Sequence, residues 1–190
     1  MRIKDDKKQE ALFRATIKLV NDIGFASSSV SKIAKSAGVS PATLYTYFRN
    51  KDDLIVSTYM TVMDAMSAGI FTGLDTTLPV RDVLHQIWRN TFGYVQANRA
   101  GFLYTEQFAK SPYVQHLKVE DLKRFYAPLV TTIRRGVEEK VLKDVHFHMH
   151  AMFFLYPIFT LANPNSCHVV PIGDETVEAA FVLAWDAIRL

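Results

Sequence analysis

Apolar residues recur along this chain at three- and four-residue steps, and this spacing predicts helices over most of its length. We expect helices over residues 7–23, 30–38, 41–47, 54–71, 80–100, 102–111, 114–141, 147–161 and 175–190. We find no run with the alternating pattern of a strand, no internal repeat and no low-complexity linker. The predicted fold class is therefore all-α.

Glycine, serine and proline mark the expected helix ends. Gly24 follows the first apolar pattern as a stop, and Gly101 is expected to begin a break. Ser40 suits the N-cap of the third helix, and Pro41 suits its first turn, where no N–H is required. Pro157 lies inside the helix of residues 147–161, so we expect a bend there.

The last predicted helix is apolar on nearly all of its faces. Such a helix must be covered on more than one side. Because the two C-terminal helices cannot both be central in a chain of this size, a second subunit is the simplest cover. Full burial within a single bundle is the alternative. The residues that we expect at a homodimer interface are Phe154, Ile158, Phe181, Ala184, Trp185 and Ile188.

The charge is distributed unevenly along the 190 residues, of which 49% are hydrophobic. Residues 1–51 contain ten Lys or Arg against four Asp or Glu, a net charge of +6, whereas residues 52–190 contain twelve against fifteen, a net charge of −3. This asymmetry predicts a basic module for a polyanion followed by a body with another function. A merely solvated basic end is the other interpretation.

The single cysteine, Cys167, fits a reducing compartment, and the charged N-terminus shows no secretory signal. The apolar stretch of residues 151–162 has only twelve residues, short of the ~20 that a bilayer requires. We therefore expect a cytoplasmic protein with no membrane partner. His146 and His150 are spaced as metal ligands could be, with Cys167 and His168 as conceivable partners, but histidines at a helix end or in solvent explain them better. We expect no metal and no cofactor.

The stretch around residues 30–47 has the pattern of a helix-turn-helix, in which the second helix enters the major groove of DNA. Its small residues let the backbone come close, and Thr43 can hydrogen-bond a base or a phosphate. Lys51 offers a charge to phosphate, while Leu44 and Phe48 should pack inward. Short helix pairs with such turns also occur as inert structure.

The segment FASSSVSKIAKSAGVSPATLYTYFRNKDDL, residues 25–54, resembles the DNA-binding domain of the TetR (TetR/AcrR) family of transcriptional repressors. The resemblance covers about residues 8–54 closely and the remainder in outline. It implies a three-helix DNA-binding domain over residues 1–51 and a larger helical ligand-binding and dimerisation domain over residues 52–190. It places contacts to DNA at Ser29, Lys32, Ser40, Pro41, Ala42, Thr43, Tyr45, Thr46, Tyr47 and Lys51.

The same resemblance implies the function. Regulators of this kind usually bind double-stranded, palindromic operator DNA as homodimers and release it when a small-molecule inducer fills a pocket. Aromatic residues with a few polar groups suit such a pocket, and the inducer could be a drug-like cation or a fatty or aromatic acid. The residues that we expect in the pocket are Trp88, Phe92, Phe102, Glu106, Tyr126 and Phe153.

Two other classes of function fit the sequence less well. The sequence has no Gly-rich phosphate loop and no nucleophile elbow, so we do not expect an enzyme. A helical adaptor could use Lys32, Lys35 and Lys51 to bind an acidic protein partner, but it would not need the small residues at the start of the helix over residues 41–47.

Overall fold

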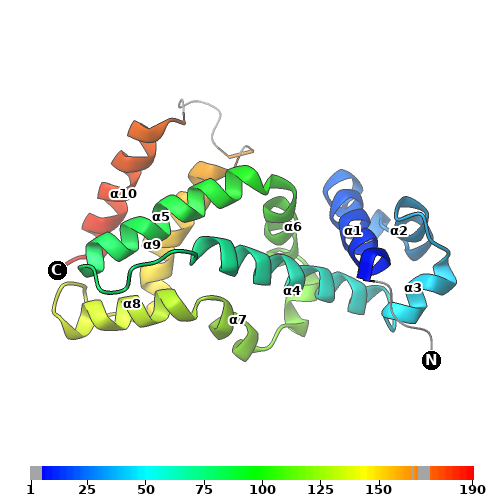
Figure 1. The fold of residues 1–190 in the computed structure, drawn as a ribbon, viewed down its shortest axis with the longest axis horizontal. Coiled ribbons are helices and arrows are strands. Elements are labelled where there is room, and N and C mark those ends of the chain that lie inside the picture. The colour runs from blue at the N-terminus through cyan, green and yellow to red at the C-terminus, as the bar shows by residue number, and fades with distance from the viewer. Residues whose placement is uncertain (1–5, 164, 167–171) are drawn as a thin grey trace. The chain divides into compact units, whose positions relative to one another are not determined.

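The computed structural model describes residues 6–163, 165–166 and 172–190, and this part of the chain is all-α. Figure 1 shows its helices, whose bounds are α1 Asp6–Ser27, α2 Val30–Ser36, α3 Pro41–Tyr47, α4 Lys51–Ile70, α5 Val80–Ala97, α6 Arg99–Ala109, the 3-10 helix η1 Pro112–His116, α7 Val119–Phe125, α8 Ala127–Glu138, α9 Phe147–Ala162 and α10 Asp174–Ile188. Within the described residues, β-type pairing is limited to one bridge between Leu142 and Arg189. No helix in those residues is long and apolar enough to cross a bilayer.

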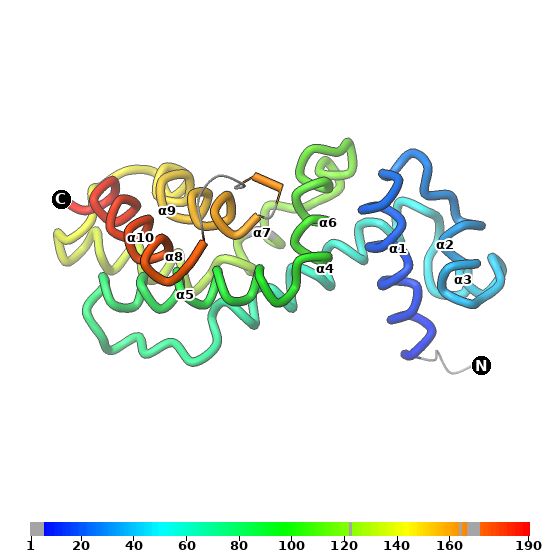
Figure 2. The backbone as a smooth tube through the Cα atoms, turned by 90° about the horizontal axis from the view of Figure 1, so that it is seen from above, coloured from blue at the N-terminus to red at the C-terminus, as the bar shows by residue number. Residues whose placement is uncertain are grey.

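The helices form two compact units. The first contains the described residues up to Asp64 together with Ala100–Val119, and the second contains Ala65–Arg99 and Glu120–Leu190. The backbone passes from the first unit into the second within α4 and returns at α6, as Figure 2 lets the reader follow.

The first unit contains a three-helix core made by α1, α2 and α3. Leu12 from α1, Ile33 from α2 and Leu44 from α3 are fully buried, and Phe48 and Leu54 complete the same cluster. Burial of each large apolar side chain contributes about 1.5–3 kcal/mol relative to exposure. The inward packing predicted for Leu44 and Phe48 is confirmed.

Aromatic packing fixes α6 to α4 and to the end of α1 within the first unit. The rings of Tyr59 on α4 and Phe108 on α6 are stacked with centroids 4.0 Å apart, and Phe25 lies edge-on to Tyr104 at 5.7 Å. The Tyr104 hydroxyl donates to the carbonyl oxygen of Ile55, 2.8 Å away. Burial raises the pKa of Tyr59 to about 12, so its phenol is neutral at physiological pH. This part of α6 is therefore firmly held.

The second unit is centred on α5, α9 and α10. The ring of Trp88 on α5 packs against Phe154 of α9 and Phe181 of α10, with centroids 5.5 and 5.8 Å away. Its Nε1–H donates to the carbonyl oxygen of Val177 at 2.9 Å, so the polar atom of this buried ring is satisfied. Trp88 thus joins the three helices.

The predicted helix over residues 114–141 is wrong, because the structure has η1, α7 and α8 in its place. Leu117 has extended backbone angles and ends η1, and Tyr126 interrupts the helical path before α8. Pro128 lies in the first turn of α8 and has no N–H for a continuing helix. Apolar spacing continued across these positions, so it did not show the breaks.

Two glycines behave differently from each other. Gly24 adopts φ 75°, a left-handed conformation that interrupts α1 where the stop was predicted. Gly101 instead lies inside α6, and the break before this helix falls at Asn98. A Cβ at Gly101 would lie 3.2 Å from a methyl of Val62, so a side chain there would crowd the contact between α6 and α4.

Candidate nucleic-acid interface

A tight turn connects α2 to α3 and sets the direction of α3. Gly38 in this turn has φ 69°, which an L side chain would adopt only with strain. Ser40 then has extended backbone angles, and its Oγ accepts a hydrogen bond from the backbone N–H of Thr43 at 3.1 Å. Pro41 occupies the first turn of α3, as predicted. The start of the candidate recognition helix is therefore determined by local chemistry.

One side of α3 is buried and the other is open. Leu44 is fully buried, which anchors the helix to the three-helix core. Tyr45 is 55% exposed, while Thr43 and Tyr47 are partly buried. The small exposed residues at the start of the helix are Ser40, Pro41 and Ala42, and Thr46 is exposed near its end. This open side allows the backbone of α3 to approach another surface closely.

The two threonine hydroxyl groups of α3 have hydrogen-bond partners within the chain. The Ser40 and Thr43 hydroxyls are 2.9 Å apart, and the Thr46 hydroxyl donates to the carbonyl oxygen of Ala42 at 3.3 Å. A hydroxyl carries one donor and two acceptor sites, so one hydrogen bond leaves further capacity. The Ser40–Thr43 hydrogen bond therefore holds both side chains in place and leaves them able to form further hydrogen bonds.

The lysines of the predicted site are held close to the backbone. Lys51 donates from Nζ to the carbonyl oxygen of Phe25 at 2.6 Å, and Lys32 donates to that of Ser27 at 3.1 Å. Ser29, whose Oγ accepts from the Lys32 backbone N–H at 3.3 Å, caps α2. An ammonium group has three N–H donors, so each lysine retains donors for an anion.

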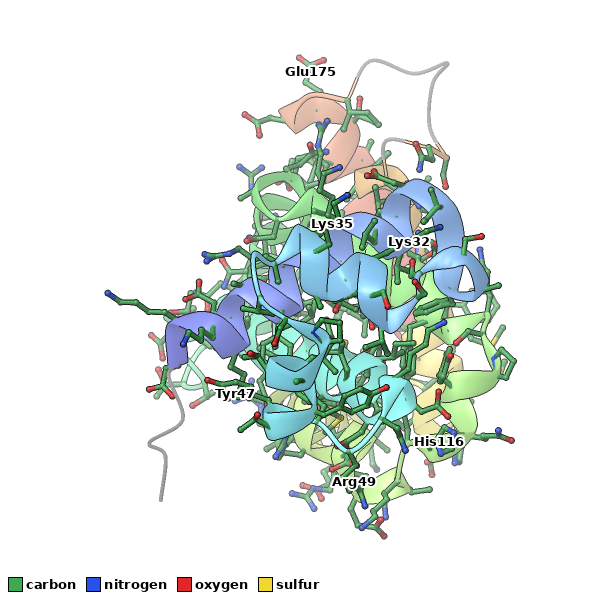
Figure 3. All side chains as sticks on the ribbon, turned by 90° about the vertical axis from the view of Figure 1, so that its right-hand side faces the viewer. Lys32, Lys35, Tyr47, Arg49, His116 and Glu175 are labelled. Atoms are coloured by element: carbon green, nitrogen blue, oxygen red, sulfur yellow. The ribbon has the colours of Figure 1, made fainter. Side chains whose placement is uncertain are left out.

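Arg49, which was not among the residues predicted to contact DNA, is a strongly exposed cation two residues beyond α3. Its side chain is 87% exposed and lies 3.4 Å from the Asp53 carboxylate through Nη2. Such a surface pair is weak, so the guanidinium can be drawn to another anion. Figure 3 shows Arg49 with Tyr47, Lys32 and Lys35 in the view that faces this end of the chain. Its position two residues after the predicted recognition helix was the sequence signal that could have identified it as a candidate DNA contact.

The residues predicted to line a ligand pocket are divided between the two units. Phe102 and Glu106 belong to α6 in the first unit, where Phe102 is buried and Glu106 partly buried. The second unit contains Trp88, Phe92, Tyr126 and Phe153. Trp88 is fully buried, Phe92 and Tyr126 are partly buried, and Phe153 is exposed.

The residues predicted for the dimer interface lie inside the second unit. Phe154, Ile158, Phe181, Ala184, Trp185 and Ile188 are all at most 9% exposed. Their own chain already covers these side chains, so they offer little surface to a second subunit. The large apolar residues that α9 and α10 expose are Met149, Met152, Phe153, Tyr156, Val182 and Leu183. The surface available to a partner is thus formed by other residues of the same two helices.

The histidines give no sign of a metal centre in the described part of the chain. No group of three or more His, Cys, Asp or Glu side chains is positioned there to hold an ion. His146 caps α9, because its Nδ1 accepts from the backbone N–H of His148 at 3.2 Å. Cys167 and His168, the conceivable partners, lie outside the described residues.

Comparison with known proteins gives two family matches. Residues 12–58 match the model of bacterial regulatory proteins of the tetR family, and residues 79–189 match the tetracyclin repressor-like C-terminal domain. An uncharacterized HTH-type transcriptional regulator of Haemophilus influenzae is 31% identical over 95% of both chains. The Bacillus subtilis fatty acid metabolism regulator protein is 40% identical over 52 residues, 27% of each chain.

The solved structures show a similar fold over the full chain. A TetR family transcription regulator from Marinobacter aquaeolei has a TM-score of 0.85 and 32% identity, covering 100% of this chain and 99% of the other. The transcriptional regulator FadR from Bacillus subtilis, solved in complex with stearoyl-CoA, has a TM-score of 0.76 and 18% identity, covering 94% and 98% of the two chains. At that identity the second likeness concerns the fold alone.

Proposed function

The chain belongs to the TetR family of bacterial transcriptional regulators, and from this we propose that it is a repressor that binds a palindromic operator as a homodimer and is released by a small molecule. We assign DNA binding to residues 1–51 and ligand binding and dimerisation to residues 52–190. Because the target is genomic DNA, the proposal places the protein in the cytoplasm.

The observation that carries the proposal is the open side of α3 on a firmly packed three-helix core. Small residues at the start of α3 let the helix lie deep in the major groove. There the hydroxyl and methyl of Thr43 reach base edges, and the Ser40–Thr43 hydrogen bond limits the rotamers of both side chains before binding. Tyr45 and Tyr47 supply hydroxyl groups to phosphate.

Cations around α3 position the protein on the phosphate backbone. Lys32 and Lys51 approach it from the starts of α2 and α4, and Ser29 can add a hydroxyl contact. We add Arg49 to this set because its exposed guanidinium follows α3 directly. These contacts set affinity and its salt dependence, whereas the side chains of α3 set sequence preference.

A second copy of this chain is the occupant that we propose for the exposed apolar faces of α9 and α10. Met152 and Tyr156 on α9 and Leu183 on α10 are large apolar or aromatic side chains in contact with solvent. Burial between two copies removes them from water, and a two-fold axis repeats the contact on both subunits. Two recognition helices about one turn of DNA apart, ~34 to 36 Å, then read a palindrome.

Ligand release requires two states with different ligand affinities. Helix α4 contributes residues to both units, so a ligand that shifts α4 also changes the path of the chain beyond α3. Changing the population from almost all binding-competent to almost none needs roughly 5.5 kcal/mol of differential affinity. Phe92, Tyr126 and the other aromatic residues of the second unit offer apolar surface for this ligand.

Selection of random duplex DNA by the purified protein at near-physiological salt, followed by sequencing of the retained DNA, tests this proposal. We expect an enriched palindrome with two half-sites. Salt-sensitive binding to every duplex without enrichment would contradict sequence-specific repression. Absence of DNA binding, with capture of an acidic protein instead, would favour the adaptor.

A further inference from the structure

The side of α3 that faces away from the three-helix core carries small side chains at its centre. Leu44 lies on the opposite side of the helix and is fully buried in the core. Ala42 and Thr46 are four residues apart, so they are neighbours on the open side, and both are exposed. Tyr45, which is 55% exposed, lies beside them. The centre of the open side is therefore formed by side chains without charged or amide groups.

The hydroxyl group of Thr46 is turned toward its own helix. Its Oγ1 donates to the carbonyl oxygen of Ala42 at 3.3 Å. A hydroxyl has one proton to donate, so this donor is already engaged. Because Thr46 is exposed while its hydroxyl is bonded to the backbone, the methyl group is the part of this side chain that the open side presents. Ala42 and Thr46 thus each offer a methyl group.

The residues of α3 include none of the side chains that usually form two hydrogen bonds with one base. Guanine is read by Arg or Lys at O6 and N7, adenine by Asn or Gln at N6 and N7, and cytosine by Glu or Asp at N4. None of these residue types occurs in the α3 sequence PATLYTY. Arg49 lies beyond the C-terminal end of α3, whereas base contacts come mainly from the N-terminal residues of a recognition helix. Polar recognition by α3 is therefore limited to single hydroxyl groups such as that of Thr43.

Thymine is the base that a surface of methyl groups favours. Its C5-methyl group lies in the major groove, where the side chain of Ala and the methyl group of Thr make apolar contact with it. Cytosine has no methyl group there and presents an N4 amino group, which a methyl group cannot hydrogen-bond. Contact between methyl groups removes apolar surface from water. The open side of α3 therefore distinguishes thymine from cytosine without a hydrogen bond.

We propose that Ala42 and Thr46 recognise the C5-methyl groups of thymines, so that each operator half-site has A·T pairs where it meets the middle of α3. This recognition rests on the proposed function, because it requires that α3 lie in the major groove. It adds the chemical feature of the DNA that is read. Thr43 contributes a hydrogen bond from its hydroxyl group, and the surrounding cations position the helix on phosphate.

Base analogues in the operator obtained by selection test this recognition with the full chain. Uracil replaces one thymine at a time, which keeps the base pair and removes only the C5-methyl group. We expect competition binding to show a loss of about fourfold at each contacted thymine, the value for one methyl-sized group that is no longer buried. The loss should be about fifteenfold when both half-sites are changed, since each subunit repeats the contact. Thymines between the half-sites are the control and should show no effect.

Exchange of a contacted T·A pair for C·G separates the methyl group from the rest of the base pair. Cytosine should weaken binding, because it lacks the methyl group and changes the hydrogen-bonding groups in the major groove. 5-Methylcytosine places a methyl group at the same position of the groove and keeps the hydrogen-bonding groups of cytosine. It should therefore bind about fourfold more tightly than cytosine.

Two variants assign the contacted thymines to their partners. Ala42→Gly removes one methyl group, and Thr46→Ser removes the other and keeps the hydroxyl. Each variant should lose the difference between thymine and uracil at its own position and keep it at the other position. The two duplexes are compared within one variant, so a less stable α3 affects both affinities alike. Thr61→Ser is the matched control and should leave both differences unchanged, because Thr61 is exposed on α4 and its hydroxyl donates to the carbonyl oxygen of Ser57 at 2.9 Å.

Four outcomes would contradict this recognition. Equal affinity for thymine and uracil at every half-site position would exclude methyl contacts, and an enriched palindrome would still support the proposed function. A selected palindrome without thymine in its half-sites would have the same meaning. A uracil effect that persists in both variants would assign the methyl contacts to other residues, and Thr46→Ser decides this alone if Ala42→Gly does not fold. Absence of any enriched palindrome would overturn the proposed function and this recognition with it.

Discussion

Lys51 donates a hydrogen bond from Nζ to the carbonyl oxygen of Phe25, 2.6 Å away, and so joins the first turn of α4 to the end of α1. The carbonyl belongs to the turn that follows the left-handed Gly24, where regular helical bonding is interrupted. The lysine that was predicted to contact phosphate therefore also stabilises the first unit. Its two roles can be separated by experiment.

Lys51→Ala should lower the free energy of unfolding by about 1 to 2 kcal/mol, since it removes a charge-assisted hydrogen bond that is partly exposed. It should also weaken binding to all DNA sequences. The slope of log affinity against log salt concentration should become shallower by about the amount that one phosphate contact contributes. Chemical denaturation and binding at several salt concentrations measure the two effects. Lys18→Ala, at a surface lysine paired with Asp22, is the control. An unchanged salt slope would leave Lys51 with the structural role only.

Thr43→Ala should weaken operator binding by about 1–3 kcal/mol and binding to random DNA much less, because it removes a base contact and the Ser40 hydrogen bond. Thr43→Ser is the matched control, since it keeps the hydroxyl group and lacks only the methyl. Competition binding with operator and random duplexes measures both. Equal losses on the two duplexes would reject a role for Thr43 in sequence preference.

Leu183→Glu should convert the proposed dimer to monomers. Leu183 is 73% exposed in the single chain, and burial of a charged carboxylate at this position between two subunits is unfavourable. Sedimentation velocity measures the change. Val119→Glu, at an exposed valine of the first unit, is the control and should leave the assembly unchanged. A dimer that persists in Leu183→Glu would exclude this face of α10. The buried Trp185 is unsuitable for such a test, since a charge there would destabilise the core itself.

Acid should remove a contribution of Glu178 to stability. Glu178 of α10 pairs with His85 at 2.7 Å and with Arg89 at 2.8 Å. Burial acts to raise the pKa of Glu178, but the hydrogen bonds and charges of His85 and Arg89 together lower it below its ordinary value of 4.5. A lowered folded-state pKa gives stability that is present above the unfolded value and is lost as the pH falls through the folded value.

Thermal melting at pH 7 and at pH 3 tests this contribution. Glu178→Gln should melt at a lower temperature than the natural chain at pH 7, and the difference should shrink as the pH falls through the folded-state pKa of Glu178. Glu175→Gln, at an exposed neighbour in the first turn of α10, is the control. A difference that stays constant with pH would contradict the ion-pair account.

Local signals in the sequence were sufficient to predict the recognition helix and its buried side. Ser40 and Pro41 mark the start of α3, and Leu44 identifies its buried side. These signals are reliable because helix caps and apolar spacing depend on only a few neighbouring residues. The same spacing failed over residues 114–141, where Pro128 and the extended Leu117 divide an apparently continuous pattern.

The exposed apolar side of α10 could not be read from the sequence for a different reason. Helix α10 carries apolar residues on nearly every side, so spacing alone cannot distinguish Trp185, which is covered by its own chain, from the exposed Leu183. Only the packing of α5 and α9 against α10 decides this.

The central claim is that two copies of α3 read one palindrome, and spacing between half-sites tests it most directly. The operator obtained by selection is compared with versions that carry five or ten added base pairs between its half-sites, about half a turn and one turn of DNA. A rigid dimer should lose affinity strongly for the five-base-pair insertion, which turns one half-site to the far side of the duplex. Equal affinity for all three duplexes would show that the copies bind independently and would contradict the account.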